Sequence, residues 1–209
     1  MDLIMKTFIC HWEKLKERKK ILLEVLQEEN LSEYEFITDY DVDNWNIEEI
    51  KKKFPKIFDL NPKGRTLKNS EISLSLKHIE IINQVAEKYE YALVLEDDVI
   101  LCDNFQEEFL KTFEQLPEDW DLGWVGTCCN LYSKPPEGMR ISKTSGSRCT
   151  HAYIISNKCA KKILEELKYC NDGADFYYNY LIEKYKLNNY WFEPPLAIQN
   201  TEFETTIQK

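Results

Sequence analysis

The sequence predicts a single α/β domain in which helices cover a central sheet. Short apolar runs of strand length alternate with amphipathic helical patterns along most of the chain, and this alternation builds a sheet between helices. The length of 209 residues fits one domain. Hydrophobic residues make up 43% of the chain and charged residues 31%, a balance that is typical of a packed core beneath a charged surface.

The first part of the chain predicts two strands around one amphipathic helix. Lys6–Cys10 is a short apolar run that predicts the first strand. Lys14–Glu29 carries leucines at helical spacing beneath a charged coat, which predicts a helix. Tyr34–Thr38 predicts a second strand. The segment that follows predicts mainly loop with one short helix, because it contains the structure breakers Pro55, Asn61, Pro62 and Gly64.

A long helix and the most apolar strand come next. Isoleucine and leucine side chains share one helical face, so we expect a helix that is capped by Asn69 or Ser70 and runs through Tyr89. Tyr91–Leu95 is a continuous apolar run, as in a strand that is buried on both faces.

The remaining elements repeat the alternation of strand and helix. Asn104 is expected to cap a helix whose phenylalanines recur every four residues. Leu122–Val125 and Ala152–Ile155 predict two further strands. Ser156 is expected to cap the helix that follows the second of these strands.

Charge and cysteine content narrow the class of protein. The chain has 27 Lys and Arg against 37 Asp and Glu, a formal net charge of −10, so we expect no nucleic-acid partner. Seven cysteines without a C-x-x-C pair indicate reduced thiols, with Cys128 and Cys129 in the core. The apolar N-terminal stretch is too short for a signal peptide or a membrane span. We therefore expect a cytoplasmic protein with no membrane span.

The strongest chemical feature is the acidic motif that ends the apolar strand. Glu96, Asp97 and Asp98 directly follow Leu95. Unpaired carboxylates are costly to bury, so they mark the point where the strand leaves the core. Ligands of open α/β sheets bind just beyond such strand ends, and clustered carboxylates suit Mg²⁺ or Mn²⁺ bridging to phosphate oxygens. The alternative is a solvated acidic turn.

Several blocks, taken in order, resemble glycosyltransferase family 25, which includes bacterial lipooligosaccharide sugar transferases and collagen galactosyltransferases. The blocks are FICHWEKLKERKK with Arg18 in the family's arginine position, EISLSLKH at 71–78, LEDD at 95–98, HAYIIS at 151–156, DGADFYYNYL with the family's aspartate at Asp175, and PPLAIQ at 194–199. The chain departs from the family pattern at Ser73, Lys77 and Ala174, which leaves the acceptor preference open.

The resemblance implies a GT-A type fold, a Rossmann-like sandwich with a central, mostly parallel sheet, formed by residues 1–209 as one glycosyltransferase domain. It also implies a Mn²⁺ or Mg²⁺ ion held against the donor diphosphate, with Asp98 as the first ligand and Glu96 as a second. Glu96 and Asp97 would then contact the donor, and Arg18 would supply a cation to it. A bound dication stabilises the charge that develops on the leaving diphosphate.

Three further residues have two interpretations each. Asp175 is the first candidate for the base that deprotonates the acceptor hydroxyl, and Asp172 is the second; alternatively, one of them caps the helix from Ala174. His78 by itself is typical of a buried, hydrogen-bonded histidine, whereas the family resemblance implies a role in donor binding.

Two functions follow from the resemblance. The first is a metal-dependent, inverting glycosyltransferase that moves galactose or glucose from a UDP-sugar to a glycan, a lipid-linked sugar or a protein hydroxyl. The second is a catalytically silent relative that binds a nucleotide or a glycan. The intact acidic triplet at residues 96–98 favours the enzyme.

Overall fold

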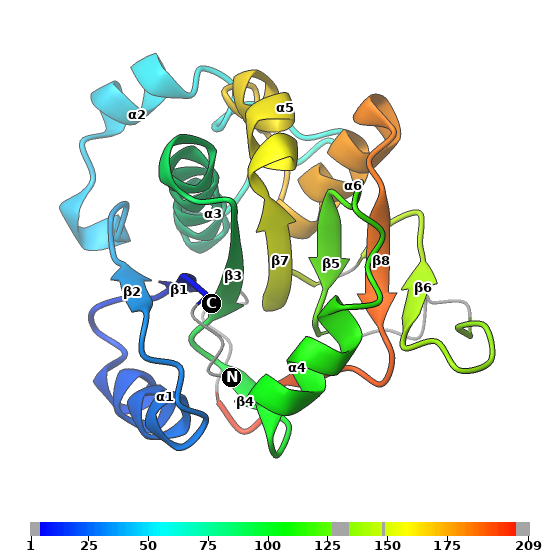
Figure 1. Cartoon of the computed structure of the whole chain (residues 1–209). Coiled ribbons are helices and arrows are strands. Elements are labelled where there is room, and N and C mark those ends of the chain that lie inside the picture. The colour runs from blue at the N-terminus through cyan, green and yellow to red at the C-terminus, as the bar shows by residue number, and fades with distance from the viewer. Residues whose placement is uncertain (1–4, 127–133, 148, 204–209) are drawn as a thin grey trace.

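The computed structural model describes residues 5–126, 134–147 and 149–203, so Cys128 and Cys129 lie outside the described residues. Helices and strands alternate through the chain, as expected (Figure 1). The elements in chain order are β1 (Thr7–Cys10), α1 (Lys16–Glu28), β2 (Tyr34–Ile37), η1 (Val42–Asn44), α2 (Ile47–Lys53), α3 (Asn69–Lys88), β3 (Tyr91–Glu96), β4 (Val99–Leu101), α4 (Phe105–Phe113), β5 (Leu122–Trp124), β6 (Ile141–Lys143), β7 (Ala152–Ser156), α5 (Asn157–Leu167), α6 (Ala174–Tyr185), β8 (Asn189–Phe192) and β9 (Ala197–Gln199).

The central sheet has seven strands in the order β2-β1-β3-β7-β5-β8-β6. Strands β1, β2 and β3 are mutually parallel, and β5 and β8 run in the same direction because each side of β7 pairs antiparallel. Only β7 and β6 run the other way within this sheet. The expectation of a mostly parallel sheet is therefore confirmed. A separate two-stranded ribbon, β4 with β9, was not predicted from the sequence.

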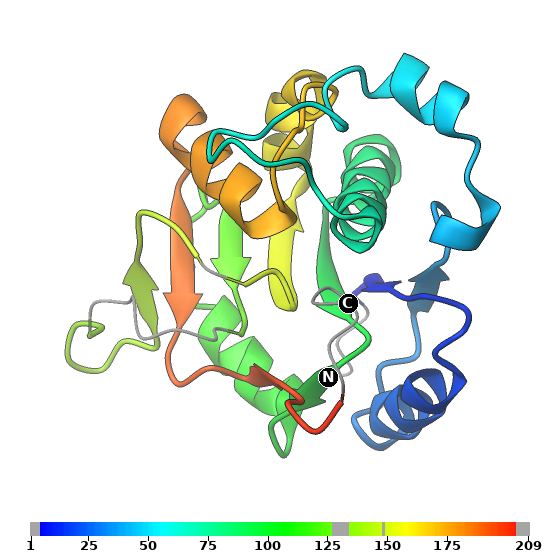
Figure 2. The ribbon, with the colours of Figure 1, turned by 180° about the vertical axis from the view of Figure 1, so that it is seen from behind.

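Helices cover both faces of the sheet, and the strand residues divide between the two resulting cores. Phe8 and Cys10 point into the core beneath α3, α5 and α6, whereas Ile9 points into the core beneath α1 and α4. The alternation follows from the two-residue period of a strand. Figures 1 and 2 show these two groups of helices on opposite sides of the sheet.

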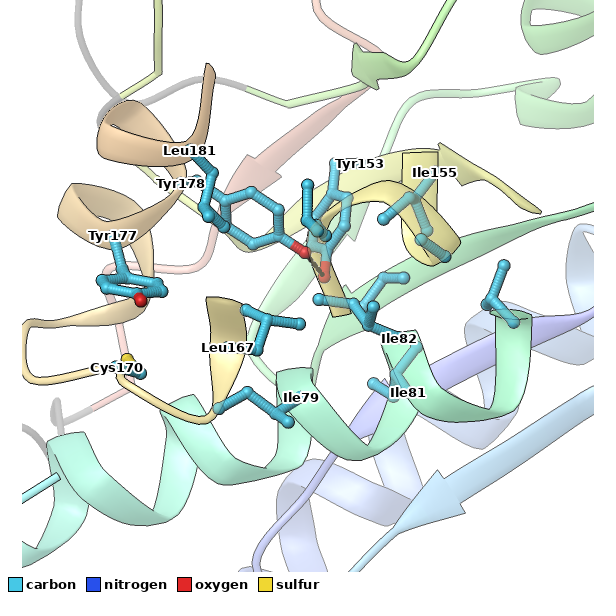
Figure 3. Packing of buried hydrophobic residues seen from close by; sticks show 14 of the residues in the cluster. Ile79, Ile81, Ile82, Tyr153, Ile155, Leu167, Cys170, Tyr177, Tyr178 and Leu181 are labelled. Atoms are coloured by element: carbon cyan, nitrogen blue, oxygen red, sulfur yellow. Dashed lines mark hydrogen bonds between the residues drawn. The ribbon is translucent and has the colours of Figure 1, made fainter. Parts of the chain in front are cut away.

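The larger core lies where α3, α5 and α6 meet β7 (Figure 3). Ile79 and Ile82 of α3 pack there with Leu167 of α5, and all three are buried. Tyr178 of α6 reaches the same core and contacts Tyr153 of β7, with ring centroids 5.2 Å apart. With Tyr177, the core contains three buried phenol groups, and each needs a hydrogen-bond partner.

The start of α3 differs from the predicted cap. Asn69 and Ser70 already lie within the helix, and Lys68 occupies the capping position without a side-chain cap. The carboxylate of Glu71 instead accepts the Lys68 backbone N–H at 2.8 Å. A side chain three residues into the helix can satisfy a free N–H in this way, so the capping position lies one or two residues before the predicted one.

The caps of α4 and α5 contrast with each other. Asn104 occupies the capping position of α4 but has φ 56° and makes no side-chain cap. Glu29, at the end of α1, accepts the Phe105 N–H at 2.7 Å in its place. Ser156 caps α5 as predicted, because its hydroxyl accepts the Cys159 N–H at 3.1 Å.

The thiols do not all follow the expectation of reduced cysteines. Cys149 is disulfide-bonded, whereas Cys10, Cys102, Cys159 and Cys170 are free. The expectation was wrong for Cys149, so the thiols no longer support a cytoplasmic location. None of the helices in the described part of the chain has both the length and the apolar character that a membrane crossing requires.

Candidate functional site

The main cavity lies at the carboxyl ends of β1 and β3 and has a volume of about 730 Å³. The chain passes from β1 to β2 on one side and reaches β3 on the other, so this is the position where open α/β sheets bind ligands. Cys10 and Glu96 are direct partners in the parallel register. The residues that follow them, His11 and Asp97, therefore meet at the floor of the cavity.

Asp97 is held by two basic side chains. Its Oδ2 lies 2.7 Å from Nδ1 of His11, and its Oδ1 accepts a hydrogen bond from Arg18 at 2.9 Å. Asp97 is 7% exposed and Arg18 is 8% exposed. The solvated acidic turn is thus wrong for this residue. Arg18 does line the cavity as predicted, and Asp97 fixes its position there.

Asp98 differs from Asp97 because only one of its two carboxylate oxygens has a hydrogen-bond partner among the described residues. Gln199 donates its amide N–H to Oδ2 at 3.1 Å, while the buried Oδ1 has no hydrogen-bond partner among the described residues. Burial, reinforced by the neighbouring Glu96 charge, raises the pKa of Asp98 to about 6. Arg18 lies 3.5 Å from Oδ2, and its charge opposes this rise without cancelling it.

These residues fit a divalent ion only with help from a ligand. Among the described residues, no three His, Cys, Asp or Glu side chains converge closely enough to hold an ion by themselves. Mg²⁺ commonly binds one or two carboxylates together with substrate phosphates and water. The free Oδ1 of Asp98 matches that mode, whereas both oxygens of Asp97 already have partners.

Glu96 lines both the main cavity and a second, adjoining cavity, and its carboxylate contacts Thr150 and His78. Its Oε1 accepts the Thr150 hydroxyl at 2.7 Å and lies 3.5 Å from Nε2 of His78. Burial opposes ionisation of Glu96, but His78 and Thr150 outweigh it and lower the pKa of the carboxyl. Burial likewise opposes the charged form of His78, and its contacts with Cys10 and Glu96 still raise the pKa of the imidazole.

His78 does not reach the donor side of the site. It is 2% exposed and is not among the residues that line either cavity. The interpretation as a buried, hydrogen-bonded histidine is therefore confirmed, with Nδ1 2.9 Å from the Tyr153 hydroxyl. His78 meets the main cavity through Cys10 and Glu96, which it contacts and which line that cavity.

A second cavity of about 260 Å³ adjoins the first, and Leu74, Glu96 and Gln199 line both. Asp175, in the first turn of α6, lines the second cavity. Burial raises the pKa of the Asp175 carboxyl, against an opposing hydrogen bond from the Phe176 N–H. Asp175 thus faces open space across the cavity from Glu96.

Asp172 has a different environment. It is buried, and its Oδ1 accepts hydrogen bonds from the Asn61 amide at 3.0 Å and the Gly173 N–H at 2.9 Å. It is not among the residues that line the two cavities. Gly173 occupies the capping position of α6 without a side-chain cap. Asp172 therefore ties a loop to the start of α6 and does not face a ligand.

Sequence reasoning missed several residues of the site. Lys77 is 3% exposed and donates to the His11 carbonyl and to the Asp41 carboxylate at the wall of the main cavity. His151 is 1% exposed, lines the second cavity and has no hydrogen-bond partner on either ring nitrogen among the described residues. The only sequence signal was the departure of Lys77 from the family pattern.

The mixed α/β sheet between two layers of helices has a GT-A type fold. A solved glycosyltransferase involved in glycosylation of the major capsid of PBCV-1 aligns with a TM-score of 0.52 and 13% identity, covering 94% of each chain. At this identity the likeness concerns the fold alone. It agrees with the predicted GT-A sandwich.

The chain belongs to glycosyltransferase family 25, described as LPS biosynthesis proteins, whose family model matches residues 4–182. It is also 28% identical over 176 residues to a protein of Acanthamoeba polyphaga mimivirus named procollagen lysyl hydroxylase and glycosyltransferase. That match covers 78% of this chain and 20% of the viral protein. The chain thus spans about a fifth of the length of this curated relative.

Proposed function

We propose that this chain is a metal-dependent, inverting glycosyltransferase that moves galactose or glucose from a UDP-sugar to an acceptor hydroxyl. The observation that carries the proposal is the junction formed by Glu96 and Gln199, which line both cavities. The larger cavity, at the ends of β1 and β3, suits the nucleoside diphosphate. The smaller one suits the acceptor, so that the sugar would lie between them.

Cationic and acidic groups in the donor cavity have complementary roles in this proposal. Arg18 would contact the diphosphate, with Asp97 holding the guanidinium in place. Asp98 would be the first ligand of Mn²⁺ or Mg²⁺ through Oδ1, with Glu96 next to it. Such an ion, when bound, neutralises charge on the leaving diphosphate. A chain with a net charge of −10 needs local cations of this kind to bind a polyanion.

Asp175 is the proposed base. The acceptor oxygen would attack the anomeric carbon, the bond from that carbon to the phosphate oxygen would break, and the acceptor proton would pass to the Asp175 carboxylate. A base must face the attacking hydroxyl, and Asp175 faces the acceptor cavity, whereas Asp172 is held by Asn61. The raised pKa of Asp175 brings it closer to the operating pH, which favours a base.

The acceptor is proposed as a hydroxyl of a glycan, a lipid-linked sugar or a protein. The name of the viral relative adds hydroxylated procollagen peptides to the acceptors worth testing. Release of UDP from UDP-galactose and UDP-glucose, measured with Mn²⁺, with Mg²⁺ and with EDTA, tests the donor and the metal. Unchanged turnover in EDTA would contradict the proposed metal dependence.

A silent binding module is the second candidate. It is favoured by one observation, namely that the described residues provide no ready three-ligand metal centre. A thermal melt with UDP and Mn²⁺ detects binding, since a ligand of the folded state raises the melting temperature. Binding without turnover of any UDP-sugar would support the module, and turnover would exclude it.

A further inference from the structure

Strand β9 and the turn that follows it contact the acidic motif at several points, although they lie beyond the residues that the family model matches. Strand β9 pairs with β4, which directly follows Asp98. The side-chain amide of Gln199 donates to Oδ2 of Asp98 at 3.1 Å, and the Asn200 N–H donates to the Asp98 carbonyl oxygen at 2.6 Å. Figure 2 shows this segment, in red, close to β4. These contacts fix the turn after β9 beside the main cavity.

Phe203, in this turn, contacts Arg18 of α1. Cζ of Arg18 lies over the Phe203 ring, 5.1 Å from its centroid, within the distance at which an arginine cation is attracted to an aromatic face. Arg18 is 8% exposed, and Phe203 is half-buried. Such an attraction is stronger where water is excluded. The ring is therefore a substantial part of the environment of the guanidinium.

Arg18 is also held by the acidic motif. Its Nη1 donates to Oδ1 of Asp97 at 2.9 Å and lies 3.5 Å from Oδ2 of Asp98. The hydrogen bond sets the direction of one nitrogen of the flat guanidinium, and a ring over the guanidinium restrains the tilt of its plane. Because the donors of arginine form a rigid, planar fork, a restraint on the plane orients all of them together.

We propose that Phe203 is a positioning residue of the main cavity, whose ring packs on Arg18 and orients its guanidinium for the donor diphosphate. Arg18 lines that cavity, whereas Phe203 is not among its lining residues, so Phe203 acts on a ligand through Arg18. The inference rests on the proposed function, in which Arg18 contacts the diphosphate. If Phe203 only filled space, any apolar side chain of similar size would serve equally well.

The contact between Phe203 and Arg18 can be tested without a ligand. The chain has four arginines, so the arginine Nε–H region of a ¹H–¹⁵N spectrum should be sparse. The signal that is lost in Arg18→Lys belongs to Arg18. A nearby aromatic ring shifts such a signal by magnetic shielding, so we expect it to move in Phe203→Leu. An Arg18 signal that is the same in Phe203→Leu and in the parent protein would overturn the proposal.

A matched pair of variants tests the effect on the donor cavity. Phe203→Leu removes the aromatic face and keeps an apolar side chain, whereas Phe203→Tyr keeps the ring. Contact between a cation and a ring typically changes an equilibrium constant by about 2- to 5-fold. We therefore expect the Kd for UDP with Mn²⁺ to rise about 2- to 5-fold in Phe203→Leu and to stay near the parental value in Phe203→Tyr.

Calorimetric titration measures these affinities, and equal Kd values for Phe203→Leu and the parent protein would overturn the proposal. Equal losses in Phe203→Leu and Phe203→Tyr would also overturn it, because the aromatic face would then have no part in the effect. A double-mutant cycle shows whether Phe203 acts through Arg18. Combined with Arg18→Gln, which lacks the cation, Phe203→Leu should no longer change the Kd. Effects that combine independently would contradict the role of Arg18 as the intermediary.

Failure of the proposed function would look different. If the parent protein neither binds UDP with Mn²⁺ nor transfers a sugar, the proposed function fails, whereas the spectrum of Arg18 still decides whether Phe203 orients it. A signal that moves in Phe203→Leu would then support the positioning contact and contradict the enzyme. An unchanged signal, together with parental UDP binding by Phe203→Leu, would contradict the role of Phe203 alone.

Discussion

Replacing Lys77 with Met should destabilise the protein strongly. Lys77 and Asp41 are 3% and 2% exposed, so both members of this ion pair are buried. The ammonium also donates to the His11 carbonyl, and Asp41 accepts the Glu13 N–H through its second oxygen at 3.0 Å. One lysine thus links α3 to two loops at the wall of the main cavity.

The magnitude follows from the charge that would be left behind. Methionine fills much of the space of the lysine stem but leaves Asp41 ionised, buried and unpaired. Removing one partner of a buried ion pair typically costs about 3–5 kcal/mol. For a domain of 150–250 residues, 1 kcal/mol lowers the melting temperature by about 2–4 °C. We therefore expect the melting temperature of Lys77→Met to fall by about 6–20 °C.

A double-mutant cycle identifies the cause. Asp41→Asn removes the charge and keeps an oxygen for the Glu13 N–H, so adding it to Lys77→Met should recover most of the lost stability. Free energies of unfolding come from urea titrations followed by circular dichroism. The reasoning is refuted if Lys77→Met costs less than about 1 kcal/mol, or if the two changes add without coupling.

Four further predictions concern the site. Asp98→Asn should abolish Mn²⁺-dependent UDP binding with little change in melting temperature, because the amide removes the charge that the ion requires. Since the pKa of Asp98 is raised to about 6, the carboxylate gains its proton as the pH falls, and UDP affinity with Mn²⁺ should weaken below about pH 6 in calorimetric titrations. Asp175→Asn should lower kcat about 10²- to 10⁴-fold, whereas Asp172→Asn should lower stability and spare turnover. Gly126→Ala should cost about 1–3 kcal/mol, as a urea titration can measure, because its Cβ would lie 2.3 Å from Nε2 of His151 and 2.7 Å from the Ala197 carbonyl oxygen.

Each of these has a contrary outcome. Parental UDP and Mn²⁺ binding by Asp98→Asn would remove Asp98 from the ligands. Loss of turnover in Asp172→Asn alone would show that the base had been assigned to the wrong aspartate. UDP affinity that stays constant below about pH 6 would contradict the raised pKa of Asp98. Unchanged stability of Gly126→Ala would show that His151 and the Ala197 carbonyl both move aside for the methyl group. The parent protein, measured in the same buffers, is the reference for all four.

The local pattern of the chain determined the elements that form the core. The apolar run at Tyr91–Leu95 became β3, and the leucine spacing of Lys14–Glu29 became α1. These predictions held because burial of a strand or a helix face depends on periodicity, which is written in consecutive residues. Strands β4, β6, β8 and β9 were not predicted from the sequence.

Only the tertiary structure decided how the acidic motif is used. The sequence identified Glu96, Asp97 and Asp98, but their partners come from distant segments: His11 lies 86 residues from Asp97, and Gln199 lies 101 residues from Asp98. The parallel register of β1 and β3 sets the first of these contacts, and the pairing of β4 with β9 sets the second. Register depends on packing between elements, which no local pattern contains.

The same reason explains the two aspartates at the start of α6, Asp172 just before it and Asp175 in its first turn. Asp172 and Asp175 are three residues apart, and from the sequence Asp175 ranked first and Asp172 second as the base without a local pattern to separate them. The structure turns Asp172 toward Asn61 and leaves Asp175 on the wall of the second cavity. The sequence by itself thus determined the family, the core elements and the acids at the strand end. The fold decided the charge state of each acid and the orientation of its side chain. The contacts that set both join segments that meet only after folding.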